Sequence, residues 1–266
     1  MSPDASLRAG ASWEETAWWT PFRWGLLDFA IFGAHLGRWG WAIPDDEKAY
    51  FMMNDSRLYV HVLLDRSGSM ETCRDKTIDA FNEFVNGLKV QSKAGTRLSL
   101  STFDSESTDL VFDTLKIAAV PRLTRSSCEP RALTPLFDAV ASTVAHIDKV
   151  NLLPDERVVF AILTDGLENA SAEMTAEAVK KLLVDRQERR NWLVQYLGAN
   201  QNAWAAGAQI GVAAHLAMDF DTGHVATAMD SMARSAHRFR AASVASARVA
   251  GAFTDDERAR SRPAKR

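Results

Sequence analysis

The sequence predicts an α/β fold: a doubly wound, mostly parallel β-sheet with one antiparallel edge strand and helices on both faces. Two observations lead to this prediction. Nearly uninterrupted apolar runs at residues 58–64 and 157–163 are typical of strands that are covered on both faces. Segments with apolar residues at helical spacing separate the strand-like runs, and an alternation of strands and helices indicates parallel pairing.

The predicted elements follow one another from residue 58 onward. Two alternating stretches, 97–103 and 110–115, flank the polar turn 104–109 and are expected to form a hairpin that supplies the antiparallel edge. The other predicted elements are a helix from Asp75 or Thr77 to before Gly95, a helix over 135–147 that follows Thr134 as cap with Pro135 at its first position, a helix from Thr175, a strand over 192–197, a short helix over 202–208 and a weaker strand over 212–218.

Residues 55–222 are predicted to form the α/β domain, and two segments flank it. Residues 1–54 contain most of the tryptophans but no period that would build a core, so we expect a poorly ordered extension there. Contact of residues 1–51 with a membrane surface is the alternative for this extension. Residues 223–266 are expected to form a helix that packs back on the domain, followed by a basic tail; Thr254 is predicted to open a last helical turn through a capping box.

The composition excludes several functional classes. Apolar residues make up 47% and charged residues 24% of the chain, which is typical of a soluble globular protein. The formal net charge of −3 does not indicate a nucleic-acid partner. There is no recognisable signal peptide and no transmembrane segment. With only two cysteines, Cys73 and Cys128, we expect free thiols and a cytoplasmic protein.

The first strand-like run ends abruptly in polar residues. Asp65, Ser67 and Ser69 alternate directly after it, so their oxygens can converge on one point, and Gly68 allows a tight turn between the two serines. A hard divalent cation such as Mg2+ prefers oxygen ligands of this kind. The ordinary alternative is a strand end whose Asp and Ser residues cap the next helix.

Two further segments favour the metal site over that alternative. Asp165 follows the strand at 157–163, which places it at the same edge of the sheet as Asp65. Thr134 directly precedes the helix at 135–147. Each residue has an ordinary explanation, as a turn acid or a helix cap, but a doubly wound sheet brings the three loops to one rim. We therefore expect a site for Mg2+, with Mn2+ or Ca2+ as alternatives.

Five residues, in this order, resemble the metal-ion-dependent adhesion site of von Willebrand factor A domains: Asp65, Ser67, Ser69, Thr134 and Asp165. The resemblance spans about residues 56 to 222. The segments Leu-Glu-Asn-Ala-Ser at 167–171 and Leu-Gly-Ala-Asn-Gln at 197–201 further resemble the standalone bacterial members of that family. One departure is Ala132, where such members often carry glycine; the alanine is expected to stiffen the loop without removing a ligand.

The resemblance implies that the three hydroxyls and two carboxylates hold the metal directly or through water. A metal held largely by neutral hydroxyls stays electrophilic, so an open coordination position can accept an Asp or Glu from a partner protein. The sequence therefore predicts a metal-dependent protein-binding module and not an enzyme. It does not specify the partner.

The main alternative is a Mg2+-dependent, phosphatase-like hydrolase that uses Asp65. Such enzymes need a second aspartate two residues on as general acid, and that position is Ser67 here. A serine hydrolase is not indicated, because the Gly-x-Ser-x-Gly elbow is missing and His61 lies inside the predicted strand as a packed residue.

Overall fold

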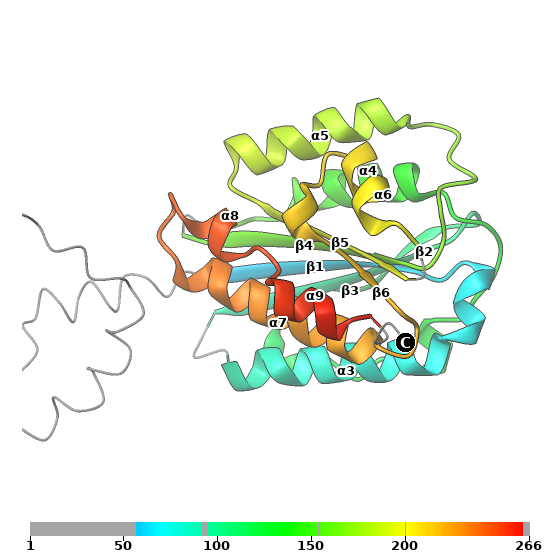
Figure 1. Ribbon diagram of the computed structural model, residues 1–266, viewed down its shortest axis with the longest axis horizontal. Coiled ribbons are helices and arrows are strands. Elements are labelled where there is room, and N and C mark those ends of the chain that lie inside the picture. Colours follow the sequence, from blue (N-terminus) through cyan, green and yellow to red (C-terminus); the bar gives the residue numbers. More distant parts are fainter. Residues whose placement is uncertain (1–56, 92–94, 154, 200, 263–266) are drawn as a thin grey trace, which may run out of the picture. The chain divides into compact units, whose positions relative to one another are not determined.

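A six-stranded sheet crosses the part of the chain that the structure describes (Figure 1). The structure is a computed structural model that describes residues 57–91, 95–153, 155–199 and 201–262. All of these residues belong to one compact unit, Ala49–Arg266. The predictions for residues 1–54, including membrane contact through residues 1–51, lie outside the described residues.

The strand order is β3-β2-β1-β4-β5-β6, and every neighbouring pair is parallel except β2 with β3. This arrangement confirms the predicted doubly wound, mostly parallel sheet with one antiparallel edge. The strands are β1 (Leu58–Asp65), β2 (Thr96–Phe103), β3 (Thr108–Lys116), β4 (Arg157–Thr164), β5 (Leu193–Ala199) and β6 (Ala217–Phe220).

Helices cover both faces of the sheet, as predicted (Figure 1). Helices α4 and α5 pack together on one face, and α3 packs with α7 on the other. The α-helices are α3 (Arg74–Gln91), α4 (Leu136–Ile147), α5 (Ala176–Arg189), α6 (Ala203–Gln209), α7 (Val225–Ala241), α8 (Ala247–Ala250) and α9 (Asp255–Arg260). Short 3-10 helices are η1 (Gly68–Thr72), η2 (Ile117–Ala119), η3 (Arg125–Ser127) and η4 (Ala214–Leu216).

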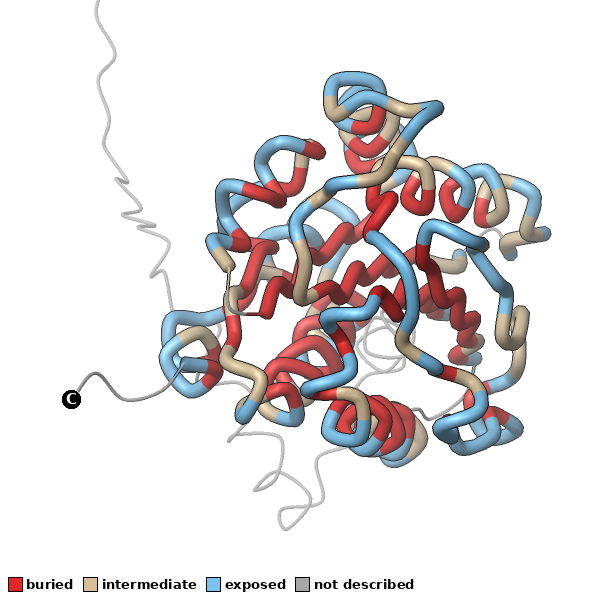
Figure 2. The backbone as a smooth tube through the Cα atoms, turned by 90° about the vertical axis from the view of Figure 1, so that its right-hand side faces the viewer, coloured by how far each residue is buried: buried red, intermediate tan, exposed pale blue. Residues whose placement is uncertain are grey.

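The central strands form the core. β1 and β5 are buried along their whole length, and Figure 2 shows buried strands running between helices that are buried only on their inner side. Because neither face of these strands meets water, their sequences are apolar runs without polar alternation.

A polar network lies within this core, around His61. The Tyr59 hydroxyl donates to Ser99 Oγ at 2.9 Å and lies 3.1 Å from His61 Nδ1. His61 Nε2 lies 2.9 Å from Ser101 Oγ. Burial, together with the nearby His146, lowers the pKa of His61 to about 3. His61 is therefore a neutral, hydrogen-bonded core residue.

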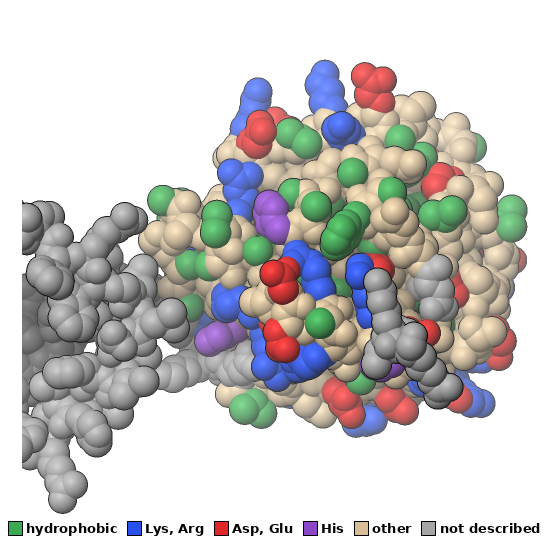
Figure 3. All heavy atoms as spheres, in the orientation of Figure 1, with side chains coloured by type: hydrophobic (Ala, Val, Ile, Leu, Met, Phe, Trp, Pro, Cys, Tyr) green, Lys and Arg blue, Asp and Glu red, His purple; other side chains and the backbone are tan. Residues whose placement is uncertain are grey.

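The C-terminal helices pack against the same unit. Helix α7 buries one stripe, including Met229, Met232 and Phe239, and it lies against α3. Thr254 caps α9 through the predicted capping box with Glu257. Figure 3 shows acidic and basic side chains interspersed on the face that carries α7 and α9.

Several predicted boundaries differ from the structure by one or two residues, for example at the strand Leu193–Ala199 and the helix Ala203–Gln209. Two other differences concern α4 and the last strand. Pro135 is the N-cap of α4, and the helix begins one residue later at Leu136. The last strand is Ala217–Phe220 and not 212–218. A turn with Gly211 at a φ of 83° lies just before this range, and the 3-10 helix η4 (Ala214–Leu216) occupies its middle, where an apolar pattern alone indicated a strand.

The strand order reverses at β1, which lies between β2 and β4. The chain leaves β1 toward α3 on one face and leaves β4 toward α5 on the other, so the two loops diverge at the carboxyl ends of β1 and β4 (Figure 1). Ligands bind at this point in open α/β sheets. Among the described residues, no helix has the length and apolar character needed to cross a bilayer.

Candidate metal centre

Asp65 is the last residue of β1 and exposes none of its surface. Its Oδ1 accepts a hydrogen bond of 2.7 Å from the Ser67 amide, and its Oδ2 accepts one of 2.5 Å from Thr164 Oγ1 at the end of β4. Burial raises the pKa of Asp65 to about 6, although these hydrogen bonds oppose the rise. The carboxylate is therefore held rigidly where the two central strands end.

The two serines connect Asp65 with the second predicted carboxylate. Ser67 Oγ and Ser69 Oγ lie 3.2 Å apart, and Ser69 Oγ donates to Asp165 Oδ1 at 2.6 Å. Burial also raises the pKa of Asp165. The Asp-x-Ser-x-Ser loop and the loop after β4 thus bring four of the predicted residues into a single chain of oxygens.

Thr134 completes this group. A Cβ atom at Gly166 would lie 3.1 Å from Thr134 Oγ1 and 3.7 Å from Ser69 Oγ, so both hydroxyls face the same glycine. Thr134 is further fixed by a reciprocal pair of hydrogen bonds. Its amide donates to Asn169 Oδ1 at 2.9 Å, and its carbonyl accepts from the Asn169 amide at 3.1 Å. The structure therefore brings all five predicted residues together.

The segments that follow Asp165 and β5 support these loops. Glu168 Oε2 accepts from the Phe137 amide at 2.9 Å, which ties the loop to the first turn of α4. Gln201 Nε2 lies 3.3 Å from the Gly166 carbonyl. These contacts explain Glu168 and Gln201, whose side chains hold the backbone around the candidate ligands.

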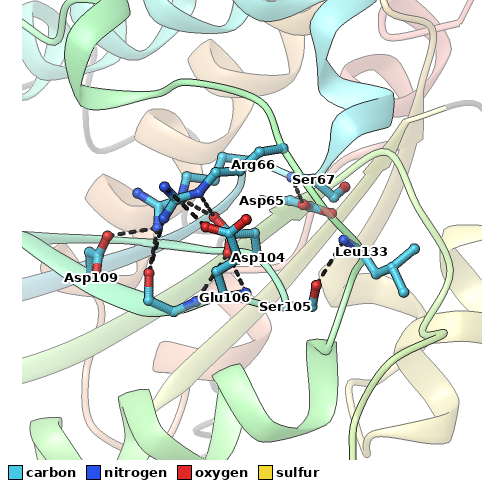
Figure 4. A network of polar contacts seen from close by, with 10 residues as sticks. Asp65, Arg66, Ser67, Asp104, Ser105, Glu106, Asp109 and Leu133 are labelled. Carbon is cyan, nitrogen blue, oxygen red and sulfur yellow. Dashed lines mark hydrogen bonds and ion pairs between the residues drawn. The ribbon is translucent and has the colours of Figure 1, made fainter.

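Arg66 supports the candidate site, and the sequence analysis missed it. It lies between Asp65 and Ser67, and Figure 4 shows its side chain directed into a polar network with Asp104 and Asp109. Its guanidinium donates to Asp104 Oδ2 and to Asp109 Oδ2, each at 2.6 Å. The Arg66 amide donates to the Phe103 carbonyl at 3.0 Å. This hydrogen bond connects the metal loop, residues 65–69, to the end of β2.

Asp104 is the centre of this network and exposes none of its side chain. It also accepts from Arg131 Nε at 2.9 Å and from the amides of Glu106 and Ser107. Burial raises the pKa of Asp104, but the hydrogen bonds from Arg131, from the two amides and from Arg66 outweigh burial and leave the pKa below its usual value. A sequence signal existed: Asp104 directly follows a predicted strand, as Asp65 does.

Ala132 adopts a left-handed backbone conformation, with a φ of 59°. Its carbonyl accepts a hydrogen bond of 3.1 Å from the Gly68 amide, so this conformation braces the metal loop from the side of Thr134. Glycine takes such a φ without steric cost. The departure from glycine noted in the sequence therefore places a strained residue next to the candidate site.

The donor atoms fit a hard divalent cation. Two carboxylates and three hydroxyls offer only oxygen, which suits Mg2+, Mn2+ or Ca2+. Across the described residues, no group of three or more His, Cys, Asp or Glu side chains could hold a metal ion. The hydroxyls of Ser67, Ser69 and Thr134 are the additional oxygen donors beside the two carboxylates of the Asp65 cluster.

The geometry does not favour the hydrolase alternative. A nucleophilic carboxylate must reach its substrate, but Asp65 has no exposed surface and both of its oxygens already accept hydrogen bonds. Cys73 and Cys128 are free and buried. Burial raises the pKa of both thiols, to about 11 for Cys128, so neither is an activated nucleophile.

Comparison with known proteins identifies the fold. No family model and no curated protein matches the sequence. The chain is similar in structure to the pilus adhesin SpaC of Lactobacillus rhamnosus GG, with a TM-score of 0.55 and 13% identity over 69% of this chain and 30% of that one. It is also similar to proximal thread matrix protein 1 of the mussel byssus, with a TM-score of 0.53 and 14% identity over 69% of this chain and 47% of that one.

A third similar structure is the von Willebrand factor domain of the type V pilus tip protein Mfa5 from Porphyromonas gingivalis. The TM-score is 0.51, with 12% identity over 68% of this chain and 95% of that one. The described part of the chain thus has the fold of a von Willebrand factor A domain. This chain spans about half the length of the mussel protein and under a third of the length of SpaC.

Proposed function

We propose that this chain is a von Willebrand factor A module of the standalone bacterial type, and that it binds a partner protein through a divalent metal. The observation that carries the proposal is the oxygen cluster at the switch point of the sheet. There, Ser69 Oγ bonds Asp165 at 2.6 Å and Gly166 leaves room for Thr134 Oγ1. The known proteins with this fold include an adhesin and a pilus tip protein, which is consistent with a binding role.

The metal we propose is Mg2+, with Mn2+ or Ca2+ as alternatives. It would be held by Asp65, Ser67, Ser69, Thr134 and Asp165. When bound, it supplies a Lewis-acidic position that can accept a carboxylate oxygen from an Asp or Glu of the partner.

The residues of the chain prepare this position in different ways. Asp65 is oriented by the Ser67 amide and Thr164, so its carboxylate needs no reorganisation to contribute negative charge. Ser69 is exposed, so one neutral hydroxyl of the proposed ligand set faces solvent, whereas Ser67 and Thr134 are buried. Two carboxylates at most offset the cation's charge, so an anionic ligand from outside remains attractive.

We also propose that the protein acts in the cytoplasm. The support is chemical: Cys73 and Cys128 are both free, as thiols are in a reducing compartment. The partner is proposed to be a protein and not a nucleic acid. Basic side chains of the C-terminal helices are paired with acids, for example Arg234 with Asp230 and Arg238 with Glu257.

Calorimetric titration of the full chain with Mg2+ tests the site. Asp65→Asn and Asp165→Asn are expected to weaken Mg2+ binding by about 100-fold or more, because each removes one of two anionic groups, while the far-ultraviolet circular dichroism stays unchanged. Asp75→Asn is the matched control, since Asp75 is an exposed aspartate that pairs with Arg125 outside the cluster. Unaltered Mg2+ affinity in Asp65→Asn would refute the site.

A further inference from the structure

Two exposed leucines flank the candidate metal centre. Leu133 directly precedes Thr134 and is 55% exposed, and Leu167 follows Gly166 and is 63% exposed. The loops that carry them adjoin, because Thr134 and Asn169 exchange two backbone-directed hydrogen bonds. An apolar side chain therefore projects from each of the two loops that frame the oxygen cluster.

The backbone under both leucines is held in place. The Leu133 amide donates to Ser105 Oγ at 3.1 Å, and Figure 4 shows the Leu133 side chain directed away from the Arg66 network. Next to Leu167, the Gly166 amide donates to Thr164 Oγ1 at 3.1 Å, and Glu168 is tied to α4. The leucines are thus presented from rigid loops, which limits the entropy lost when a partner covers them.

Neither leucine belongs to the hydrophobic core or to the apolar residues packed against it. A single exposed leucine is ordinary on a protein surface. Two leucines beside one polar centre have the arrangement of an interface hot spot, in which surrounding groups exclude water from the central contact. Removing water also strengthens the electrostatic attraction between a cation site and a carboxylate.

We propose that Leu133 and Leu167 select a partner segment in which an Asp or Glu is flanked by large apolar side chains. This inference rests on the proposed metal-dependent function and adds the partner's chemistry to it. The acid would meet the metal position, and its apolar neighbours would cover the two leucines. A small free carboxylate fills only the centre, so the occupant is a polypeptide.

A peptide array tests this inference with the full chain in the presence of Mg2+. Each peptide carries a central Asp, Glu, Asn or Gln between randomised flanking residues. We expect binding to Asp and Glu peptides over the amides, and among these a preference for Leu, Ile, Phe or Met beside the acid. For a peptide chosen from the array, Leu133→Ser and Leu167→Ser should each weaken binding about tenfold, and the double variant about 100-fold.

Val244→Ser is the matched control. Val244 is 71% exposed. It lies far from the candidate metal centre: the carbonyl of nearby Ala242 accepts a hydrogen bond from Arg157, which is at the start of β4, whereas Asp65 lies where the parallel strand β1 ends. This variant should bind the peptide like the original chain. Mg2+ titration of the two leucine variants should give the original affinity, which shows that fold and metal site are intact.

The possible results separate the two proposals. The role of the leucines would be overturned by either of two results: the array shows a preference for Asp and Glu but none for apolar neighbours, or the leucine variants bind within about twofold of the original chain. Both results would leave the proposed function standing. Equal binding of acid and amide peptides, or binding that survives a chelator, would overturn the proposed function itself.

Discussion

Arg66→Gln is expected to destabilise the domain, because Arg66 is the buried cation that joins the metal loop to the β2–β3 turn. The side chain donates to Asp104 and Asp109, each at 2.6 Å, and to Ser107 Oγ at 2.8 Å. Glutamine keeps part of the apolar stem but removes the charge. Asp104, which has no exposed side-chain surface, then loses one of its two cationic partners.

The magnitude follows from the contacts that remain. Removing one partner of a buried ion pair costs about 3–5 kcal/mol, and a hydrogen bond to a charged group contributes about 1.5–3 kcal/mol. Asp104 keeps Arg131 and two backbone amides, and the half-exposed Asp109 keeps its contact with water. The loss of unfolding free energy should therefore lie at the lower end, at about 2–3 kcal/mol.

Urea denaturation followed by circular dichroism measures this change. Arg125→Gln is the matched control, since Arg125 forms a comparable pair with Asp75 on the surface, where such pairs add little. We also expect Arg66→Gln to weaken Mg2+ binding about tenfold, because Arg66 positions the loop that carries the serines. If Arg66→Gln lowered the unfolding free energy no more than Arg125→Gln does, the network would not be the support that its geometry indicates.

The remaining predictions concern one strained residue and one buried base. Ala132→Gly should raise the unfolding free energy by about 0.5–1 kcal/mol. Relief of the left-handed strain contributes about 1–2 kcal/mol, which exceeds the cost of the greater conformational freedom of glycine in the unfolded chain. A variant that is less stable in urea would contradict the strain. His61 has a folded pKa of about 3 against 6.5 when unfolded, so its contribution to stability is fully present above pH 6.5 and is lost as the pH falls below that value. The loss between pH 7 and pH 5 amounts to about 2 kcal/mol. In His61→Gln, urea midpoints should change less over this range, and an unchanged pH profile would show that another group is responsible.

The periodic patterns of the sequence determined the elements of this fold. Strands buried on both faces must be apolar throughout, so β1 and β4 were recognisable within a residue or two of their ends. The hairpin β2–β3 followed from local alternation and a polar turn. The boundary of α4 was wrong because Pro135 is its N-cap and not its first residue. The boundary of β6 was wrong because the 3-10 helix η4, which has no periodic apolar pattern of its own, directly precedes the strand.

The five candidate ligands were also predictable, because each follows or precedes an element at the edge where the strand order reverses. What the sequence could not provide was their mutual position. Ser69 and Asp165 are 96 residues apart along the chain, and only the parallel pairing of β1 with β4 brings them within hydrogen-bonding distance. The topology of the sheet determines this contact, and it cannot be predicted from the local sequence pattern.

The tertiary structure alone decided the support of the site. The sequence assigned Arg66 no role, but the packing of β1 beside β2 turns it toward Asp104, 38 residues away. Ala132 was expected to stiffen its loop, and the structure adds that its φ of 59° makes it strained. Sequence by itself determined which side chains could bind a metal, since donor chemistry belongs to the residue. The fold determined which of them are buried, paired or left exposed at the rim, since burial and pairing belong to contacts between distant segments.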